Sequence, residues 1–139
     1  SVGSPLSGAL LDTSLVIGGS EPGRLELPET MAISVITLGE LRAGVRLASD
    51  PSVRADRRRR LNAVRDAFDP IPVDEAVAEC YGEVLAAARS AGRTTKATDL
   101  LIIATAAATG RVLHTLDQRQ AAVAKTAGVA VRSPGSPSP

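Results

Sequence analysis

The fold is decided by the stretch DLLIIATAAATGRVLHTLDQRQAAVAKTAGVAVR, which occupies residues 99–132. Its first part is apolar nearly all round a helical wheel, which predicts a helix buried at the centre of a domain. Gly110 and Gly128 stand where the apolar pattern predicts that a helix ends. The series helix, strand, helix and strand favours parallel strands covered by helices. The expected elements are a helix at 99–109, a strand at 112–116, a helix at 117–127 and a strand at 129–132.

The first half of the chain has the same alternation of apolar strands and amphipathic helices. Thr37 and Glu40 match the T-x-x-E capping box that opens a helix, at the end of the β-branched run MAISVI at 31–36. The whole pattern predicts an α/β fold, a three-layer α/β/α domain with a central, mainly parallel sheet of about four to five strands. The expected elements are strands at 9–11 and 31–36, a short extended piece at 71–73, and helices at 15–17, 37–47, 51–68 and 74–89.

The chain of 139 residues has the length of a single domain. We expect residues 1–8 to be a flexible N-terminal segment, 9–132 to be the domain, and 133–139 to be a disordered Pro/Ser tail. The single cysteine, Cys80, excludes an intramolecular disulfide. The longest apolar run, at 100–109, is about half of the roughly 20 residues that a membrane helix needs. No signal-peptide pattern precedes the domain, so we expect a cytoplasmic protein with no membrane partner.

Four acidic residues follow the predicted strands. Asp12 comes directly after the first strand, and Asp117 comes directly after the strand at 112–116. Glu40 lies one helical turn after the second strand, and Asp99 opens the buried helix. In open parallel sheets, ligands bind beyond the carboxyl ends of the strands, where loops lead into the helices. We therefore expect the four carboxylates to point into one cleft.

A cluster of carboxylates needs a counter-charge, because close like charges raise pKa values and oppose folding. Mg²⁺ prefers oxygen ligands, and a bound divalent ion can polarise a phosphodiester and activate water. Each acid also has a purely structural interpretation: an Asx turn for Asp12, the N3 carboxylate of the capping box for Glu40, the favourable end of a helix dipole for Asp99, and an N-cap for Asp117. Their joint placement after strands is what favours a metal site.

Four segments resemble, in order and approximate spacing, the successive motifs of PIN-domain ribonucleases. More narrowly, they resemble the VapC toxins of bacterial toxin–antitoxin pairs. The resemblance spans about residues 9–132. The segments are LLDTS at 10–14, SVITLGEL at 34–41, TDLLIIA at 98–104 and LHTLD at 113–117.

The resemblance implies a Mg²⁺- or Mn²⁺-dependent endoribonuclease that hydrolyses RNA, with tRNA or rRNA as the substrate, and thereby inhibits translation and growth. It also implies a homodimer and neutralisation by a VapB-type antitoxin whose tail covers the active site. Position in the motifs marks Thr13 and Thr115 as hydroxyls that orient a carboxylate or a metal-bound water. The implied metal-binding and catalytic acids are Asp12, Glu40, Asp99 and Asp117.

The sequence departs from the family pattern after the last acid. Many relatives have a further polar or acidic residue shortly after that position, where this chain has Gln118, Arg119 and Gln120. This departure puts a second metal ion in doubt, so one ion is the expectation.

RNA has to be held without base stacking, because Phe68 and Tyr81 fall on apolar helix faces that we expect to be core. Contacts from basic side chains to phosphate are the remaining route. The candidates are Arg42 and Arg46, in the helix after the second strand, and Lys96, just before the buried helix.

Three further features have structural interpretations. The run RRRR at 57–60 predicts a solvated helix face, as charge runs usually do. His114 is expected to be a core residue, because water bound to a metal needs no histidine base. Cys80 lies on an apolar helix face and predicts a small core side chain.

Two other classes of α/β protein also carry acids after their strands, but the acids they need differ from those of this chain. A haloacid-dehalogenase-type phosphatase needs a second acid two residues after Asp12, where Ser14 stands. A receiver domain needs adjacent acids after the first strand and a lysine near the last strand. The alternative that remains is a catalytically silent PIN-like module that binds RNA or protein. Four intact acids argue against it, because a silent domain gains nothing from their repulsion.

Overall fold

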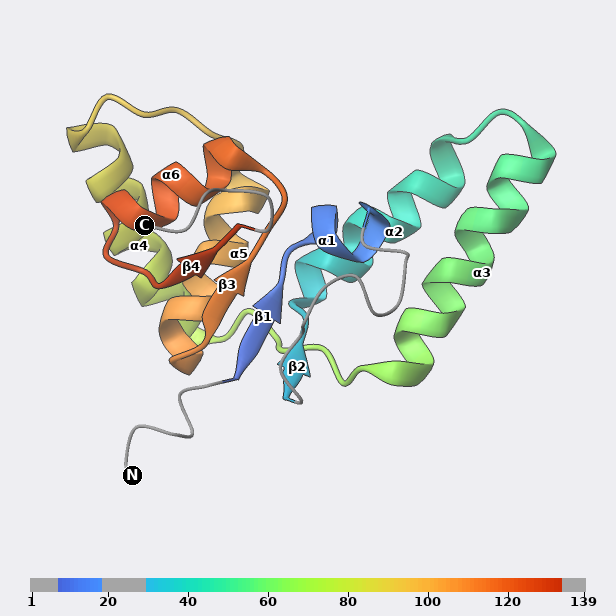
Figure 1. The fold of residues 1–139 in the computed structure, drawn as a ribbon, viewed down its shortest axis with the longest axis horizontal. Helices are drawn as coiled ribbons and strands as arrows, with labels where there is room; N and C mark the ends of the chain where they lie inside the picture. Colours follow the sequence, from blue (N-terminus) through green and yellow to red (C-terminus); the bar gives the residue numbers. More distant parts are fainter. Residues whose placement is uncertain (1–7, 19–29, 134–139) are drawn as a thin grey trace.

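The computed structural model describes residues 8–18 and 30–133 of the chain (Figure 1). Most of the two ends predicted to be flexible, 1–7 and 134–139, lies outside the described residues. The strands are β1 (Ala9–Leu11), β2 (Met31–Ala32), β3 (Val112–His114) and β4 (Val131–Arg132). The helices are α1 (Thr13–Gly18), α2 (Val35–Leu47), α3 (Pro51–Ala67), α4 (Glu75–Ser90), α5 (Ala97–Thr109) and α6 (Gln118–Thr126).

The four strands form a parallel sheet in the order β2-β1-β3-β4. Leu10 pairs with Ala32 on one side and with Leu113 on the other, so β1 is at the centre of the sheet. Because all strands run the same way, their carboxyl ends meet at one edge, from which α1 and α6 start. The parallel α/β/α prediction is confirmed.

Side chains that alternate along β1 enter two different cores, as the pleat of a strand requires. Leu10 packs into a cluster with α4, α5 and α6, whereas Leu11 packs into a second cluster with α1, α2 and α3. Helix α5 is the central helix that the sequence predicted, since six of its side chains are buried. They are Leu100, Ile102, Ile103, Ala104, Thr105 and Ala106.

The predicted strand at 31–36 is too long, and the predicted capping box is wrong. Ser34 is the N-cap of α2, where its hydroxyl accepts a hydrogen bond from the amide of Ile36 at 3.0 Å. This cap starts the helix at Val35, so Thr37 lies inside the first turn and Glu40 lies in the second turn. Serine is among the strongest N-cap residues, and here it outweighs the β preference of the branched residues after it.

Smaller differences lie at other boundaries. Helix α5 begins at Ala97, two residues before the predicted start, with Lys96 as its N-cap and without a side-chain cap. Strand β3 ends at His114 rather than at residue 116, because the amides of Leu116 and Asp117 donate to side-chain oxygens instead of a strand. The extended piece predicted at 71–73 forms one parallel bridge between Ile71 and Ser34.

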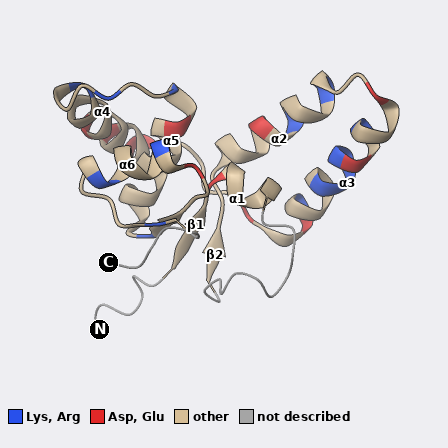
Figure 2. Cartoon of the chain, turned by 45° about the horizontal axis from the view of Figure 1, so that its top comes forward, with Lys and Arg blue, Asp and Glu red and all other residues tan. Residues whose placement is uncertain are grey.

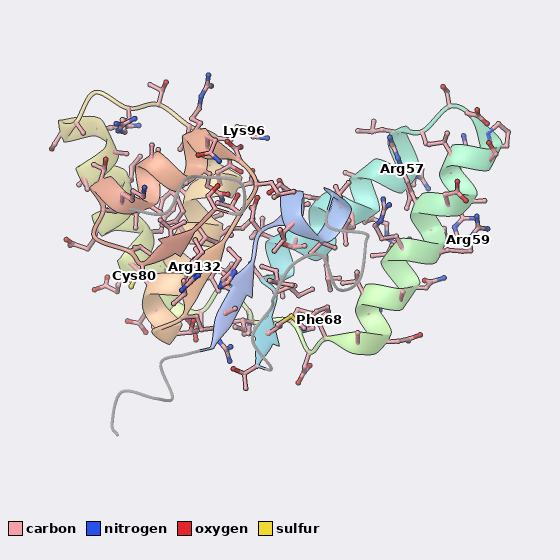
Figure 3. All side chains as sticks on the ribbon, viewed as in Figure 1. Arg57, Arg59, Phe68, Cys80, Lys96 and Arg132 are labelled. Atoms are coloured by element: carbon pink, nitrogen blue, oxygen red, sulfur yellow. The ribbon has the colours of Figure 1, made fainter. Side chains whose placement is uncertain are left out.

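Helices α2 and α3 form an antiparallel hairpin that projects from the sheet (Figure 1). Arg57 donates to the carbonyl of Gly44 at 2.8 Å and lies between the two helices in Figure 3, while Arg54 donates to the carbonyl of Ala48 at 2.7 Å. Arg59 is paired with Asp56 on the exposed side of α3. Part of the basic run therefore holds the hairpin together. None of the helices in the described ranges is both long and apolar enough to cross a bilayer.

Candidate active site

The carboxylate of Asp12 lies just beyond the end of β1 and is almost completely buried. Its Oδ2 accepts a hydrogen bond from the amide of Ser14 at 3.1 Å, which is the Asx turn that the sequence allowed. The same oxygen lies 3.1 Å from Thr115 Oγ1, which can donate to it. The amide of Asp12 donates to the carbonyl of His114 at 2.8 Å. Asp12 is thus fixed by its own turn and by the neighbouring strand.

Thr115 is the junction of a buried polar network at this edge of the sheet. Its side chain is completely buried, and its hydroxyl accepts a hydrogen bond from the amide of Asp117 at 3.0 Å. Gln120 Oε1 is 2.8 Å from the same hydroxyl, and Ser14 Oγ is 3.2 Å away. The network connects the turn after β1 with the start of α6.

Asp117 is the N-cap of α6, as its structural interpretation predicted. Its Oδ1 accepts hydrogen bonds from the amides of Arg119 at 2.9 Å and Gln120 at 3.2 Å. The residue itself is exposed. The cap fixes the direction of the carboxylate at the mouth of the site.

Asp99 lies in the first turn of α5 and is half-buried. Burial is the main cause that raises the pKa of Asp99, and the negative charges of Asp12 and Asp117 raise it further. Lys96 and a hydrogen bond from the hydroxyl of Thr95, at 3.2 Å, act in the opposite direction. Asp12, Asp99 and Asp117 therefore lie within one electrostatic neighbourhood.

Glu40 lies on α2 and is connected to the turn after β1 through Thr13. Its carboxylate accepts a hydrogen bond from Thr13 Oγ1, which is also 3.0 Å from the buried hydroxyl of Thr37. Thr13 therefore links Glu40 to the turn that carries Asp12. Among the described residues, no three Asp, Glu, His or Cys side chains are close enough to form a ready-made metal site. The expectation that Glu40 joins the other acids stays a prediction.

A pocket of about 680 Å³ opens beside the acids, with Asp99 and Asp117 in its wall. Lys96 and Arg119 supply positive charge to the same wall, and Figure 3 shows Lys96 on the side of the molecule where the strands end. The other residues that line the pocket are Thr94, Thr95 and Gln118. Arg42 and Arg46, which the sequence also suggested for RNA, are exposed on α2 and do not line this pocket. In Figure 2, acidic ribbon appears at the end of β1 and around the start of α5.

Comparison with known proteins gives the family. The family model of the PIN domain matches residues 9–126. The chain belongs to the PIN-domain family. It is 45% identical over 100 residues to Ribonuclease VapC8 of Mycobacterium tuberculosis, and the aligned region covers 70% of this chain and 88% of that protein. It is 33% identical over 131 residues to Ribonuclease VapC5 of the same species, and the aligned region covers 92% of this chain and 96% of that protein.

Solved structures agree with this assignment. The crystal structure of VapBC-5, a member of the VapBC family of toxin–antitoxin systems from Mycobacterium tuberculosis, has a TM-score of 0.80 at 32% identity. It covers 91% of this chain and 98% of that one. The crystal structure of FitAcB from Neisseria gonorrhoeae has a TM-score of 0.75 at 30% identity and covers 91% of this chain and 97% of that one.

The donor set of this PIN domain fits a hard divalent cation. Burial and two neighbouring carboxylates raise the pKa of Asp99, so a positive charge at this place would relieve a repulsion that the folded chain carries. Mg²⁺ commonly keeps several waters and takes only one or two carboxylates from a protein, so a ready-made cage of three acids is not required. Asp12, Asp99 and Asp117 are the residues that could hold such an ion.

The sequence did not single out Ser14, Gln120 and Arg119 as functional. Ser14 contacts Thr115 and accepts from the amide of Leu116 at 3.0 Å, and only the fold brings these residues together. Gln120 stands three residues after Asp117, on the inner side of α6, and a polar residue in an otherwise apolar helix face was the available signal. His114 is buried as predicted, and burial together with Arg132 lowers its pKa, so it is neutral at pH 7.

Proposed function

We propose that this PIN domain is a metal-dependent endoribonuclease that acts as the toxin of a VapBC-type pair and inhibits translation by cleaving tRNA or rRNA. One observation carries the proposal: Asp12 and Asp117 follow adjoining ends of a parallel sheet and, together with burial, raise the pKa of Asp99. The names of the relatives, ribonucleases of the VapC group, give the chemical class.

Mg²⁺ or Mn²⁺ at this site would polarise the phosphodiester and supply an activated water. The chain contributes fixed carboxylates. Asp12 is held by Ser14 and Thr115, Asp99 is held by Thr95, and Asp117 is held by the first amides of α6. These contacts reduce the reorganisation that the acids need when substrate binds. Thr13 donates to Glu40, and the role we propose for this pair is to orient water at the scissile phosphate.

The substrate side of the proposal rests on two cations. Lys96 and Arg119 line the pocket that contains Asp99 and Asp117, so they can contact phosphates on either side of the cleaved bond. Arg42 and Arg46 are exposed on α2 and would contact a longer RNA farther from the reaction. Stacking on aromatic residues has no part in the proposal, because Phe68 and Tyr81 pack against the two cores.

A VapB-type antitoxin and a second copy of the chain are the proposed protein partners. The α2–α3 hairpin offers apolar surface for a protein partner, since Leu47 is 81% exposed at its tip and Val53 is 37% exposed nearby. Burying such side chains between proteins is favourable. A cytoplasmic location belongs to the same proposal, because the RNA substrates are there.

The test is cleavage of purified tRNA and rRNA by the chain with Mg²⁺ or Mn²⁺. We expect cleavage that EDTA abolishes and that Asp99→Asn lowers by at least about 100-fold, which is the scale on which preorganised electrostatic groups act. Asp66→Asn, at an exposed acid on α3, is the matched control and should cleave as wild type does. Cleavage in EDTA, or full activity of Asp99→Asn, would contradict the proposal. RNA binding without cleavage under both metals would favour a silent binding module.

A further inference from the structure

Gln120 is the largest polar side chain among those that the structure buries completely. It comes from the inner side of α6, where its neighbours Ala121, Val123 and Ala124 are apolar and buried. Burying an amide without partners costs free energy, whereas a leucine at the same place would add to the core. The position therefore calls for an explanation beyond packing, and the contacts of the amide supply one.

The amide of Gln120 reaches two acid-bearing segments. Its Oε1 is 2.8 Å from Thr115 Oγ1, and that hydroxyl is 3.1 Å from Asp12 Oδ2. Its Nε2 donates to the backbone carbonyl of Asp99 at 3.4 Å, a long contact. A continuous path of polar atoms thus runs from Asp12 through Thr115 and Gln120 to Asp99. This path spans three elements that are far apart in the sequence, the turn after β1, the start of α6 and the start of α5.

The proton of the Thr115 hydroxyl decides what this path does. A hydroxyl has one proton, and three oxygens that can accept it lie within reach: Gln120 Oε1 at 2.8 Å, Asp12 Oδ2 at 3.1 Å and Ser14 Oγ at 3.2 Å. The distance to Gln120 is the shortest of the three. When the proton points to Gln120, the carboxylate of Asp12 keeps more of its negative charge for a cation. Gln120 also restrains the start of α5 through the carbonyl of Asp99.

We propose that Gln120 is a positioning residue: its buried amide couples Asp12, through Thr115, to Asp99, and so tunes the affinity of the acids for a divalent cation. This inference rests on the proposed function, because it concerns the same metal site. It assigns a role to a residue outside the four motifs that carry the family resemblance, and it makes a prediction about affinity as well as about activity.

A structural role alone would make a different prediction. If Gln120 only attached α6 to β3, its loss would lower the stability of the fold and leave metal affinity as it is. The variant Gln120→Met removes both polar atoms and keeps an unbranched side chain of similar volume, so the core can stay filled. Gln120→Leu is the second variant, in case the methionine destabilises the fold. The control is Val123→Ala on the same helix, a fully buried side chain in the core cluster of α4 and α5.

The measurement is Mn²⁺ binding to the full chain by isothermal titration calorimetry, with urea unfolding of each variant in parallel. We expect Gln120→Met and Gln120→Leu to bind Mn²⁺ about 10-fold more weakly than wild type, the scale of outer-shell partners of metal ligands. Val123→Ala should lose stability and bind Mn²⁺ within about twofold of wild type. The inference is overturned if both Gln120 variants bind as wild type does, or if Val123→Ala weakens binding equally.

The same titration separates this inference from the proposed function. A wild-type chain that binds Mn²⁺ more tightly than the Gln120 variants do but cleaves no RNA would refute the nuclease and leave the positioning role intact. A wild-type chain that cleaves RNA with Mn²⁺, together with Gln120 variants of unchanged affinity, would refute the positioning role and leave the nuclease intact. A wild-type chain that binds no Mn²⁺ would overturn both.

Discussion

Replacing Thr115 by valine should lower both the stability of the fold and the activity of the site. Valine has nearly the shape of threonine, so the change removes one hydroxyl and little else. Thr115 is completely buried, and its hydroxyl contacts Asp12, Gln120, Ser14 and the amide of Asp117. Substitution therefore removes one contact from each of these groups at once.

The size of the loss can be worked from the partners. Gln120 Oε1 is buried and loses the partner that lies 2.8 Å away, which costs about 1–3 kcal/mol. Asp12 keeps the amide of Ser14 but loses a hydrogen bond to a charged group, which is worth about 1.5–3 kcal/mol. The amide of Asp117 is near solvent and can bind water instead. The single hydroxyl proton is donated to one of these acceptors at a time, so the two losses are not additive, and we expect about 2–3 kcal/mol in total.

Urea unfolding followed by far-UV circular dichroism measures this loss, since the chain has no Trp and a single Tyr for fluorescence. Thr105→Val is the matched control. Thr105 is also completely buried, but its hydroxyl donates to the carbonyl of Leu101 at 2.8 Å, one helical turn earlier in α5. That carbonyl also accepts a helical amide, so the control should lose less than about 1 kcal/mol. Equal losses for the two variants, or a loss below about 1 kcal/mol for Thr115→Val, would refute the network.

Three further predictions concern charge. In EDTA, Asp99→Asn should be more stable than wild type at pH 7, because burial and the neighbouring acids raise the pKa of Asp99 above 3.8. Thermal melts should show this advantage shrink as the pH falls, and it should vanish well below pH 3.8, where the carboxyl is neutral in both the folded and the unfolded state. Mg²⁺ should stabilise wild type only. Lys96→Ala and Arg119→Ala should each lower the slope of log Kd for RNA against log salt concentration by about 0.7, because each removes one phosphate contact. The control Lys125→Ala, at an exposed position elsewhere on α6, should leave the slope unchanged. Unchanged slopes for Lys96→Ala and Arg119→Ala would remove these residues from the RNA site. Arg57→Ala should lower the free energy of unfolding by about 1 kcal/mol, because the carbonyl of Gly44 loses a donor, and it should leave RNA cleavage unchanged. Arg58→Ala is the control. Equal stability of the two variants would contradict the role of Arg57 in the hairpin.

The layers of the fold were predictable because the signals for them are local. The apolar run of α5, the glycines after α5 and α6, and the short apolar strands each depend on a few consecutive residues. The boundary near residue 35 was not predictable in the same way. MAISVI has the composition of a strand, yet the cap formed by Ser34 and the packing of Ile36 against the core stabilise a helix there. A local cap and a tertiary contact together overrode the β preference of these residues.

The site could be predicted in part. The acids were found because they follow strands, and the carboxyl ends of parallel strands share one edge. Gln120 and Ser14 were missed because both contact Thr115 only in the folded chain. Ser14 follows β1, whereas Thr115 follows β3, and Gln120 reaches Thr115 from the first turn of α6. Lys96 was found beside the pocket, whereas Arg42 and Arg46 lie outside it, because the sequence does not determine how far α2 stands from α5.

The structural and the functional interpretations of the acids are two uses of the same carboxylates. Asp12 receives its hydrogen bonds from Ser14 and Thr115 on Oδ2, and Asp117 caps α6 with Oδ1. Asp99 receives the bond from Thr95 on Oδ2. In each case these bonds between described residues fall on one oxygen of the carboxylate and restrict its rotation, so the other oxygen can serve as a ligand. A cap that uses one oxygen thus orients the other, and an acid at a helix start can serve the fold and the metal together.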